Sequence, residues 1–353
     1  PVITVGRYTE PQFAELMVKE GRADLVAFGR QSLADPAMPK KAQEERLEDM
    51  TPCIACLQGC VANMYAGNPV CCLTNPFLGH EAEPLEKAEE PKKVMVIGGG
   101  VAGLSAAFIA KERGHEVTLY EAGDILGGNM RLAAYPPGKG DITNMIRSYI
   151  HRCQKDGVKI VMNCEVTPEL IKEEKPDSVI IATGSKTLIL PIEGIDNPAI
   201  IHGSDLLDGK RAAGKKVLVV GGGMVGCETA AFLGEQEHDV TVIEFRDTVG
   251  ADVIHEHRVY LMKDFEDYGI KEITGAKVCK FYEDGVEYET ADGVRHESRG
   301  YDSVILSMGF RNYNPLEEKI KDLVPETHVI GDAIRARRAL DATKEAYEVA
   351  SRI

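Results

Sequence analysis

The sequence has few basic side chains and no long apolar run. Its 41 lysines and arginines face 56 aspartates and glutamates, which gives a formal net charge of −15. Nucleic acids and anionic membrane surfaces both bind basic proteins, so the charge argues against either partner. No stretch approaches the roughly 18 consecutive apolar residues that a transmembrane helix needs. We therefore expect a protein that binds neither nucleic acid nor membrane.

The first residues, Pro1-Val-Ile-Thr-Val, include no initiator Met and no signal-peptide features. A disulfide framework is also unexpected, because the nine cysteines are an odd number and five of them fall between Cys53 and Cys72. Such a cluster is typical of a metal or iron–sulfur site in a reducing compartment. We expect a cytoplasmic protein, and association into a homo-oligomer stays open.

Residues 1–45 have the pattern of one βαβ unit. Short apolar strands are expected at 2–5 and 23–28, with a helix at 10–20 between them. Such strands need cover on both faces, which a single parallel pair cannot provide. We therefore expect residues 1–45 to be the last part of a larger parallel α/β domain. The alternative is a small subdomain that packs on the rest of the chain.

An internal repeat follows the cysteines. The segment from Lys92 (Lys-Lys-Val-Met-Val-Ile-Gly-Gly-Gly-Val-Ala-Gly) matches the segment from Lys215 (Lys-Lys-Val-Leu-Val-Val-Gly-Gly-Gly-Met-Val-Gly) at an offset of 123 residues. Residues 116–121 and 239–244 match at the same offset, and both end in a glutamate. Each copy reads as strand, glycine turn, helix, strand and acid. The repeat predicts two doubly wound α/β units of common ancestry.

Both turns have the G-x-G-x-x-G spacing of a dinucleotide-binding loop. The first glycine permits the tight turn, the second lets a pyrophosphate approach the backbone, and the third lets helix and strand pack closely. The N–H groups at the helix start then face the phosphates, and the acid can accept the ribose hydroxyls. Two nonfunctional turns are the weaker interpretation. The residues concerned are Gly98, Gly100, Gly103 and Glu121 in the first copy, and Gly221, Gly223, Gly226 and Glu244 in the second.

Glu244 bears on the choice of nicotinamide cofactor. A carboxylate at this position repels a 2′-phosphate, which favours NADH over NADPH. Arg246 follows closely in the sequence and either offsets this effect or is a solvated loop residue. The sequence therefore predicts NAD(P)H, with NADH favoured.

The cysteines form the pattern C-x-x-C-x-x-x-C at Cys53, Cys56 and Cys60, followed by Cys71 and Cys72. Four thiolates at these separations suit a [4Fe–4S] cluster. Structural zinc sites usually have two C-x-x-C pairs, a redox dithiol needs only two cysteines, and buried structural cysteines are a third alternative. Spacing does not decide between Cys71 and Cys72 as the fourth ligand.

This order of motifs resembles the iron–sulfur flavoproteins of the old yellow enzyme superfamily, which include 2,4-dienoyl-CoA reductase, enoate reductases and trimethylamine dehydrogenase. The resemblance covers the whole chain. Its most specific stretch is Cys53-Ile-Ala-Cys56-Leu-Gln-Gly-Cys60 with Cys72-Leu-Thr-Asn-Pro76. In the family the last cluster cysteine directly precedes a Leu-x-Asn-Pro segment, which implies Cys72 as the fourth ligand.

The resemblance also implies the cofactor of each segment. The loop at Gly98 would bind FAD together with Gly331 and Asp332, for which a plain helix cap is the alternative role. The loop at Gly221 would bind the nicotinamide. Segments 2–7 and 24–30 resemble the seventh and eighth strands of a (β/α)₈ barrel, whose ends hold the phosphate of FMN. The residues at those ends are Gly6, Gly29 and Arg30.

The expected fold is therefore α/β, with four parts. They are the last βαβ of a (β/α)₈ barrel at 1–45, an iron–sulfur segment with a linker at 46–92, an FAD-binding domain at 93–185 and 312–353, and an NAD(P)H-binding domain at 186–311. Both nucleotide-binding domains are Rossmann-like and of the two-dinucleotide-binding type.

The resemblance implies an oxidoreductase in which electrons pass from NADH to FAD, then to the [4Fe–4S] cluster and to FMN. The final acceptor would be an activated C=C bond in a small-molecule substrate such as an enoate or an enoyl-CoA. The family's catalytic residues lie on barrel strands outside this sequence, so the chain alone should be limited to electron transfer from NADH to FAD. Two alternatives are an amine dehydrogenase like trimethylamine dehydrogenase and a stand-alone electron-transfer module like the small subunit of glutamate synthase.

Overall fold

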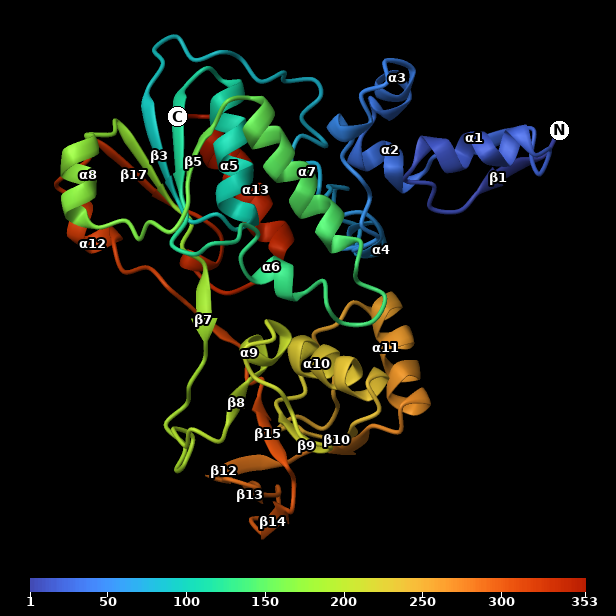
Figure 1. Ribbon diagram of the computed structural model, residues 1–353, viewed down its shortest axis with the longest axis vertical. Coiled ribbons are helices and arrows are strands. Elements are labelled where there is room, and N and C mark those ends of the chain that lie inside the picture. The colour runs from blue at the N-terminus through green and yellow to red at the C-terminus, as the bar shows by residue number, and fades with distance from the viewer. The chain divides into compact units, whose positions relative to one another are not determined.

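The computed structural model describes residues 1–353, and the chain divides into two compact units (Figure 1). The first unit comprises Pro1–Arg131, Asp141–Ser185 and Asn312–Ile353, and the second comprises Leu132–Gly140 and Lys186–Arg311. The chain passes from the first unit to the second within β7 (Ser185–Thr187) and returns within β16 (Phe310–Asn312). These two strands pair as a two-stranded sheet. None of the helices has both the length and the apolar character that crossing a membrane requires.

A five-stranded parallel sheet forms the centre of the first unit, in the order β17-β6-β3-β4-β5. Successive side chains of β3 point to opposite faces, so Val94 and Val96 join one core and Met95 and Ile97 join another. Helices α5, α7 and α13 cover the first face, and α8 and α12 cover the second. This cover on both faces explains the continuous apolar strands. The elements are β3 (Lys93–Ile97), β4 (Glu116–Tyr120), β5 (Lys159–Val161), β6 (Ser178–Ile181), β17 (Glu326–Val329), α5 (Val101–Glu112), α6 (Asn129–Leu132), α7 (Ile142–Lys155), α8 (Pro168–Glu174), α12 (Glu317–Ile320), η2 (Gly331–Ala333) and α13 (Ala339–Ala350).

The second unit repeats this plan with a parallel sheet in the order β11-β10-β9-β15-β8. Val217 and Val219 of β9 pack toward α10 and α11, and Leu218 and Val220 pack toward the antiparallel sheet β12-β13-β14. The antiparallel sheet therefore covers the face that corresponds to the one under α8 and α12 in the first unit. The elements are β8 (Ile201–His202), α9 (Gly203–Leu207), β9 (Lys216–Val220), α10 (Met224–Glu235), β10 (Asp239–Ile243), α11 (His255–Asp267), β11 (Lys271–Ile273), β12 (Lys277–Tyr282), β13 (Gly285–Glu289), β14 (Arg295–Arg299) and β15 (Ser303–Leu306).

The N-terminal segment contains a parallel pair of strands joined by a helix, as its pattern predicts. The expectation that these strands are buried is wrong within this chain, because Ile3 is 59% exposed and Leu25 is 54% exposed. The two strands form a sheet of their own, and neither contains a buried residue. The elements are β1 (Ile3–Val5), α1 (Pro11–Lys19), β2 (Leu25–Ala27), α2 (Arg30–Ala34), α3 (Met38–Gln43), η1 (Leu47–Asp49) and α4 (Val61–Tyr65).

Candidate cofactor-binding sites

The first glycine loop connects β3 to α5 and has no room for side chains at two of its glycines. Gly98 has φ +109°, and a Cβ on it would lie 2.3 Å from the Ala182 carbonyl oxygen. A Cβ on Gly103 would lie 1.9 Å from the Gly98 carbonyl oxygen, so the helix can pack this closely only with glycine there. Gly100 is different, because no atom lies within 4 Å of its Cβ position. The backbone at Gly100 is thus open to a ligand.

Glu121, which follows β4, lies directly beside this loop. Its Oε2 accepts a hydrogen bond from the Gly99 N–H at 2.6 Å, and its Oε1 accepts one from the Gly123 N–H at 2.8 Å. Each carboxylate oxygen keeps capacity for a second donor. The loop therefore orients the acid, and the acid can still accept hydroxyl groups from a ligand.

Gly331 and Asp332 meet the same loop from the other end of the chain. Gly331 has φ +63°, and its Cβ position lies 3.1 Å from the Ala102 Cβ in the first turn of α5. Asp332 Oδ2 accepts a hydrogen bond from Ser185 Oγ at 2.8 Å, and its Oδ1 accepts one from the Arg337 N–H at 3.0 Å. Asp332 lies inside η2 and is not the residue that caps α13. The plain helix-cap alternative therefore does not describe it.

The second glycine loop has the same construction. A Cβ on Gly221 would lie 2.4 Å from the Ser307 carbonyl oxygen, and one on Gly226 would lie 1.8 Å from the Gly221 carbonyl oxygen. Glu244 Oε2 accepts a hydrogen bond from the Gly222 N–H at 2.5 Å, and its Oε1 accepts one from the Arg246 N–H at 2.9 Å. A groove opens on this loop. Its lining includes Gly221, Gly222, Gly223, Met224, Val225, Glu244, Arg246, Thr248, Ala251, Asp252, Ser307, Met308 and Gly309.

Asp252 also lines the groove, although the glycine motif does not predict it. Its Oδ1 accepts a hydrogen bond from the N–H of Met224, the first residue of α10, at 2.8 Å. The repeat contains the signal that would have found it, because the offset of 123 residues continues past the acids and pairs Asp252 with Asn129. Gly250 N–H donates to the Gly222 carbonyl oxygen just as Gly127 N–H donates to that of Gly99.

The five clustered cysteines line one cavity in the first unit, together with Arg30 and apolar side chains. The backbone around Cys56 is tightly wound, since its neighbours Ala55 and Leu57 have φ +53° and +57°. A Cβ on Gly59 would lie 2.5 Å from the Cys71 carbonyl oxygen, so glycine is needed where the two parts of the segment meet.

The cysteines are not equivalent within the cavity. The pKa of the Cys56 thiol is raised to about 12, mainly by burial and also by the neighbouring thiols of Cys72, Cys60 and Cys53. Burial likewise raises the pKa of Cys72, with a contribution from Cys53. Cys71 and Cys72 each have a hydrogen-bond partner, because Cys71 Sγ accepts from Asn63 Nδ2 at 3.4 Å and Cys72 Sγ pairs with Thr74 Oγ1 at 3.3 Å.

The donor set of the cavity fits a [4Fe–4S] cluster, because five thiols line it and such a cluster takes four thiolate ligands. In a [4Fe–4S] cluster each thiolate binds a different iron, so its ligands are spread over a wider space. Because a thiol with a raised pKa is protonated at neutral pH, iron binding at Cys56 must release a proton.

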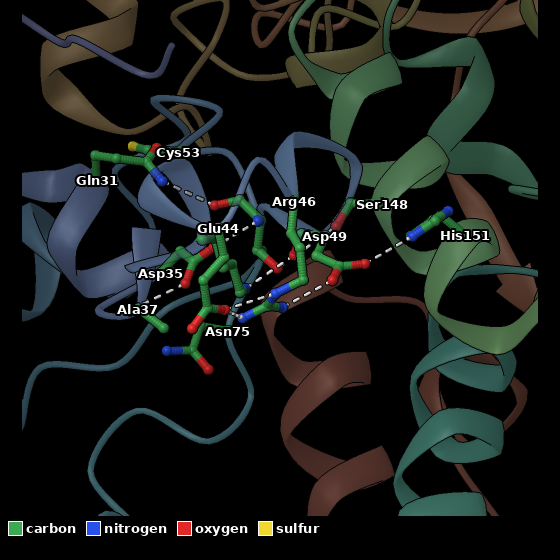
Figure 2. A network of polar contacts seen from close by, with 12 residues as sticks. Gln31, Asp35, Ala37, Glu44, Arg46, Asp49, Cys53, Asn75, Ser148 and His151 are labelled. Carbon is green, nitrogen blue, oxygen red and sulfur yellow. Dashed lines mark hydrogen bonds and ion pairs between the residues drawn. The ribbon is translucent and has the colours of Figure 1, made fainter. Parts of the chain in front are cut away.

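A polar network holds the start of the cysteine segment (Figure 2). The buried Gln31 accepts a hydrogen bond from the Cys53 N–H at 2.8 Å and donates one to the Thr51 carbonyl oxygen at 3.0 Å. The buried Asp35 accepts from the Thr51 N–H at 2.9 Å and pairs with Lys41 at 2.8 Å. Sequence patterns gave no indication of Gln31 or Asp35, because their partners lie on a segment without regular structure.

Asp49 connects the same segment to α7. Its carboxylate accepts from His151 Nε2 at 3.0 Å and pairs with Arg46 at 2.8 Å (Figure 2). It also pairs with Lys155. The pKa of Asp49 is strongly lowered, first by the hydrogen bond from Lys155 and then by those from Arg46 and His151. The segment is therefore tied to the helix layer of the first unit.

The residues predicted to hold the FMN phosphate lie after the two N-terminal strands and at the start of the next helix. Gly6 follows β1 and Gly29 follows β2, so both lie at the carboxyl ends of a parallel pair, with no atom within 4 Å of either Cβ position. Arg30 begins α2 and lines the cysteine cavity. The structure thus places an arginine between these strand ends and the cysteines.

Comparison with known proteins identifies the class. Residues 92–327 match the model of the pyridine nucleotide-disulphide oxidoreductase family, and the chain belongs to that family. Residues 1–49 match the model of the NADH:flavin oxidoreductase / NADH oxidase family. The resemblance to the iron–sulfur flavoprotein branch of the old yellow enzyme superfamily is thereby confirmed.

Individual relatives match along the whole chain. The NADH oxidase of Thermoanaerobacter brockii is 37% identical and the cinnamate reductase of Clostridium sporogenes is 34% identical; each match covers 100% of this chain, and 55% and 53% of the respective relative. The structure of 2-naphthoyl-CoA reductase with 2-naphthoyl-CoA matches with a TM-score of 0.95 at 34% identity, covering 100% of this chain and 54% of that chain. The chain spans about half the length of the relatives it matches. The dimethylamine dehydrogenase of Hyphomicrobium sp. is 28% identical.

Proposed function

We propose that this chain is the nicotinamide- and FAD-binding part of an NAD(P)H-dependent oxidoreductase that also uses a [4Fe–4S] cluster and FMN. Its substrate would be an activated C=C bond of the enoate or enoyl-CoA type. The observation that carries the proposal is that the cysteine cavity shares a core with the first glycine loop, while an equivalent loop lies in the second unit. The names of the relatives, a cinnamate reductase and a 2-naphthoyl-CoA reductase, support the substrate class.

The first loop would bind FAD. Gly98, Gly100 and Gly103 would leave the backbone open to the pyrophosphate, Glu121 would accept the ribose hydroxyls, and Gly331 and Asp332 would contact the ribityl phosphate. The cysteine segment supports this choice, because Gln58 Oε1 accepts a hydrogen bond from the N–H of Leu340 in α13 at 3.4 Å. Since α13 follows Gly331 and Asp332, the cofactor that exchanges electrons with the cluster belongs at this loop.

The second loop would bind the nicotinamide dinucleotide through Gly221, Gly223 and Gly226. Glu244 would accept the adenosine ribose hydroxyls and repel a 2′-phosphate, which favours NADH. Arg246 lines the groove and is exposed, so it is free to turn toward a ligand.

The proposed cluster ligands are Cys53, Cys56, Cys60 and Cys72. All four line one cavity, and the pKa of Cys56 is influenced by the other three thiols, which supports the set. The Leu-Thr-Asn-Pro segment directly after Cys72 supports Cys72 over Cys71. A bound flavin would accept two electrons from the nicotinamide and release them singly to the cluster. The residues of this chain would hold the cofactors and shield the thiolates from water.

The N-terminal segment would belong to a (β/α)₈ barrel, with Gly6, Gly29 and Arg30 at the FMN phosphate. The exposed apolar strands β1 and β2 support this, because they need further strands to cover them. The family match over residues 1–49 favours a reductase with a barrel over a stand-alone electron-transfer module. An amine dehydrogenase is less favoured, since the dimethylamine dehydrogenase is less similar to this chain in sequence than the cinnamate reductase.

Separate sites for FAD and the cluster can be tested with Cys56→Ser. The variant should lose the broad visible absorbance of a cluster, yet its FAD should still be reduced by NADH. Cys279→Ser, which lies outside the cavity, is the matched control and should keep both properties. Loss of FAD reduction in a folded Cys56→Ser protein would contradict the separation of the two sites.

A further inference from the structure

At one matched position after the two glycine loops, the first copy has a neutral residue and the second has a charged one. The repeat aligns Asn129 with Asp252, because each follows the loop glycine that hydrogen-bonds back to the first turn, Gly127 in one copy and Gly250 in the other. The matched position therefore holds a neutral amide in the first copy and, in the second, a carboxylate that lines the groove. The difference matters because both loops are built to receive an anion.

Asp252 lies where a pyrophosphate would bind. Its Oδ1 accepts the Met224 N–H at 2.8 Å, and its carboxylate atoms lie 3.6–3.9 Å from the Cβ position of Gly223. The first N–H groups of a helix have no partner inside the helix, and together with the helix dipole they attract phosphate. In this structure the carboxylate of Asp252 takes one of those N–H groups.

The first loop has no such competitor. Asn129 Nδ2 donates to Ser185 Oγ at 3.3 Å, and Asn129 does not bond the N–H of Val101, the first residue of α5, as Asp252 bonds that of Met224 in α10. The electrostatic environment of α10 is acidic as well, since Asp252 helps to raise the pKa of the buried Glu228 in that helix, although burial is the main cause. Glu228 is paired with Lys139, and the carboxylates that line the groove are Asp252 and Glu244.

We propose that Asp252 sets the affinity of the second loop for its dinucleotide by competing with the pyrophosphate for the start of α10. The proposal rests on the proposed function, in which the second loop binds nicotinamide dinucleotide and the first binds FAD. A cosubstrate must leave after each hydride transfer, whereas FAD must stay. A carboxylate at one loop and an amide at the other contributes to this difference between the two sites. Asp252 lies on the loop between β10 and α11, outside any helix or strand.

The test uses the full chain with FAD bound and measures the Kd of NAD⁺ by calorimetry, which avoids reduction of the flavin. Asp252→Asn removes the charge but keeps an acceptor, and Asp252→Ala also frees the Met224 N–H. We expect Asp252→Asn to lower the Kd by roughly 2- to 10-fold and Asp252→Ala to lower it at least as much. Asp247→Asn is the matched control, because it removes one charge from the same loop at a residue outside the groove lining. It should change the Kd by less than about twofold.

A second readout does not involve the dinucleotide. Without NAD⁺, Asp252→Ala should unfold at a lower temperature than the wild type because the Met224 N–H loses its acceptor, and Asp252→Asn should not, since the Asn amide oxygen also accepts a hydrogen bond. An unchanged or higher Kd for NAD⁺ in both Asp252 variants, with FAD retained, would overturn the proposal while leaving the nicotinamide site intact. Failure of the wild type itself to bind NAD⁺ would overturn the proposed function and the role of Asp252 with it.

Discussion

At the scale of single residues, the two dinucleotide loops depend on contacts between backbone atoms. The third glycine of each loop lies so close to the carbonyl of the first that a methyl group would overlap it, at 1.9 Å for Gly103 and 1.8 Å for Gly226. Gly100 has no such neighbour. Steric exclusion by the protein and approach by a ligand are therefore separate reasons for glycine at different positions of one motif.

Alanine substitutions should separate these two reasons. Gly103→Ala should destabilise the chain by about 1–3 kcal/mol and lower its FAD content, because α5 must move away from β3. Gly100→Ala should leave the unfolding temperature unchanged yet also lower FAD content, because its methyl group meets only the ligand. Gly226→Ala should weaken NADH binding while FAD remains bound. Flavin absorbance per chain and thermal unfolding are the measurements, and a stable, FAD-replete Gly103→Ala protein would refute the steric argument.

A second residue-scale prediction separates the adjacent cysteines. Cys72→Ser should abolish the visible absorbance of the cluster, because the Cys72 thiol influences the buried Cys56 thiol and directly precedes the Leu-Thr-Asn-Pro segment. Cys71→Ser should retain it, because Cys71 is not one of the proposed ligands. Iron and sulfide analysis of both purified variants provides the measurement. The reverse pattern would make Cys71 the fourth ligand.

At the scale of secondary-structure elements, the cysteine segment has little regular structure and is held by its neighbours. Gln31 of α2 and Asp35, which follows that helix, fix its start, Asp49 ties it to α7, and Gln58 contacts α13. A cluster ligand set on a loop needs such support, because ligands that move are poorly placed for the metal. We infer that α2 and α7 position the thiolates as much as the cysteine segment does.

Asp49 gives this element-scale support a pH dependence. Its pKa is lowered in the folded chain by Lys155, Arg46 and His151, so its carboxylate stabilises the fold above the unfolded pKa of about 4. That contribution should be lost as the pH falls below this value toward the lowered pKa. Asp49→Asn should therefore have a lower unfolding temperature than the wild type at pH 7, and the difference should shrink between about pH 4 and pH 3. An equal difference in unfolding temperature at pH 7 and at pH 3 would show that the ion pairs of Asp49 contribute nothing to the stability of the fold.

At the scale of the whole molecule, the local motifs could be predicted from the sequence and the long-range contacts could not. The two loops and their acids were readable because strand, turn, helix and strand are contiguous and the copies repeat at a fixed offset. The network around Cys53 was not, because its partners join α2, the cysteine segment and α7 through single polar side chains that follow no periodicity. The exposure of β1 and β2 was missed because apolar composition indicates what a strand needs, not what this chain supplies.

The two glycine loops would bind different dinucleotides, and electrons would pass from the nicotinamide at the second loop to the FAD at the first. The most direct test is to release the flavin from purified chain by denaturation, identify it by chromatography, and titrate the native protein with NADH under anaerobic conditions while following flavin absorbance. The account predicts one FAD per chain, and bleaching by NADH that Gly226→Ala weakens. Recovery of ADP without FAD, or FAD that NADH does not bleach, would contradict it.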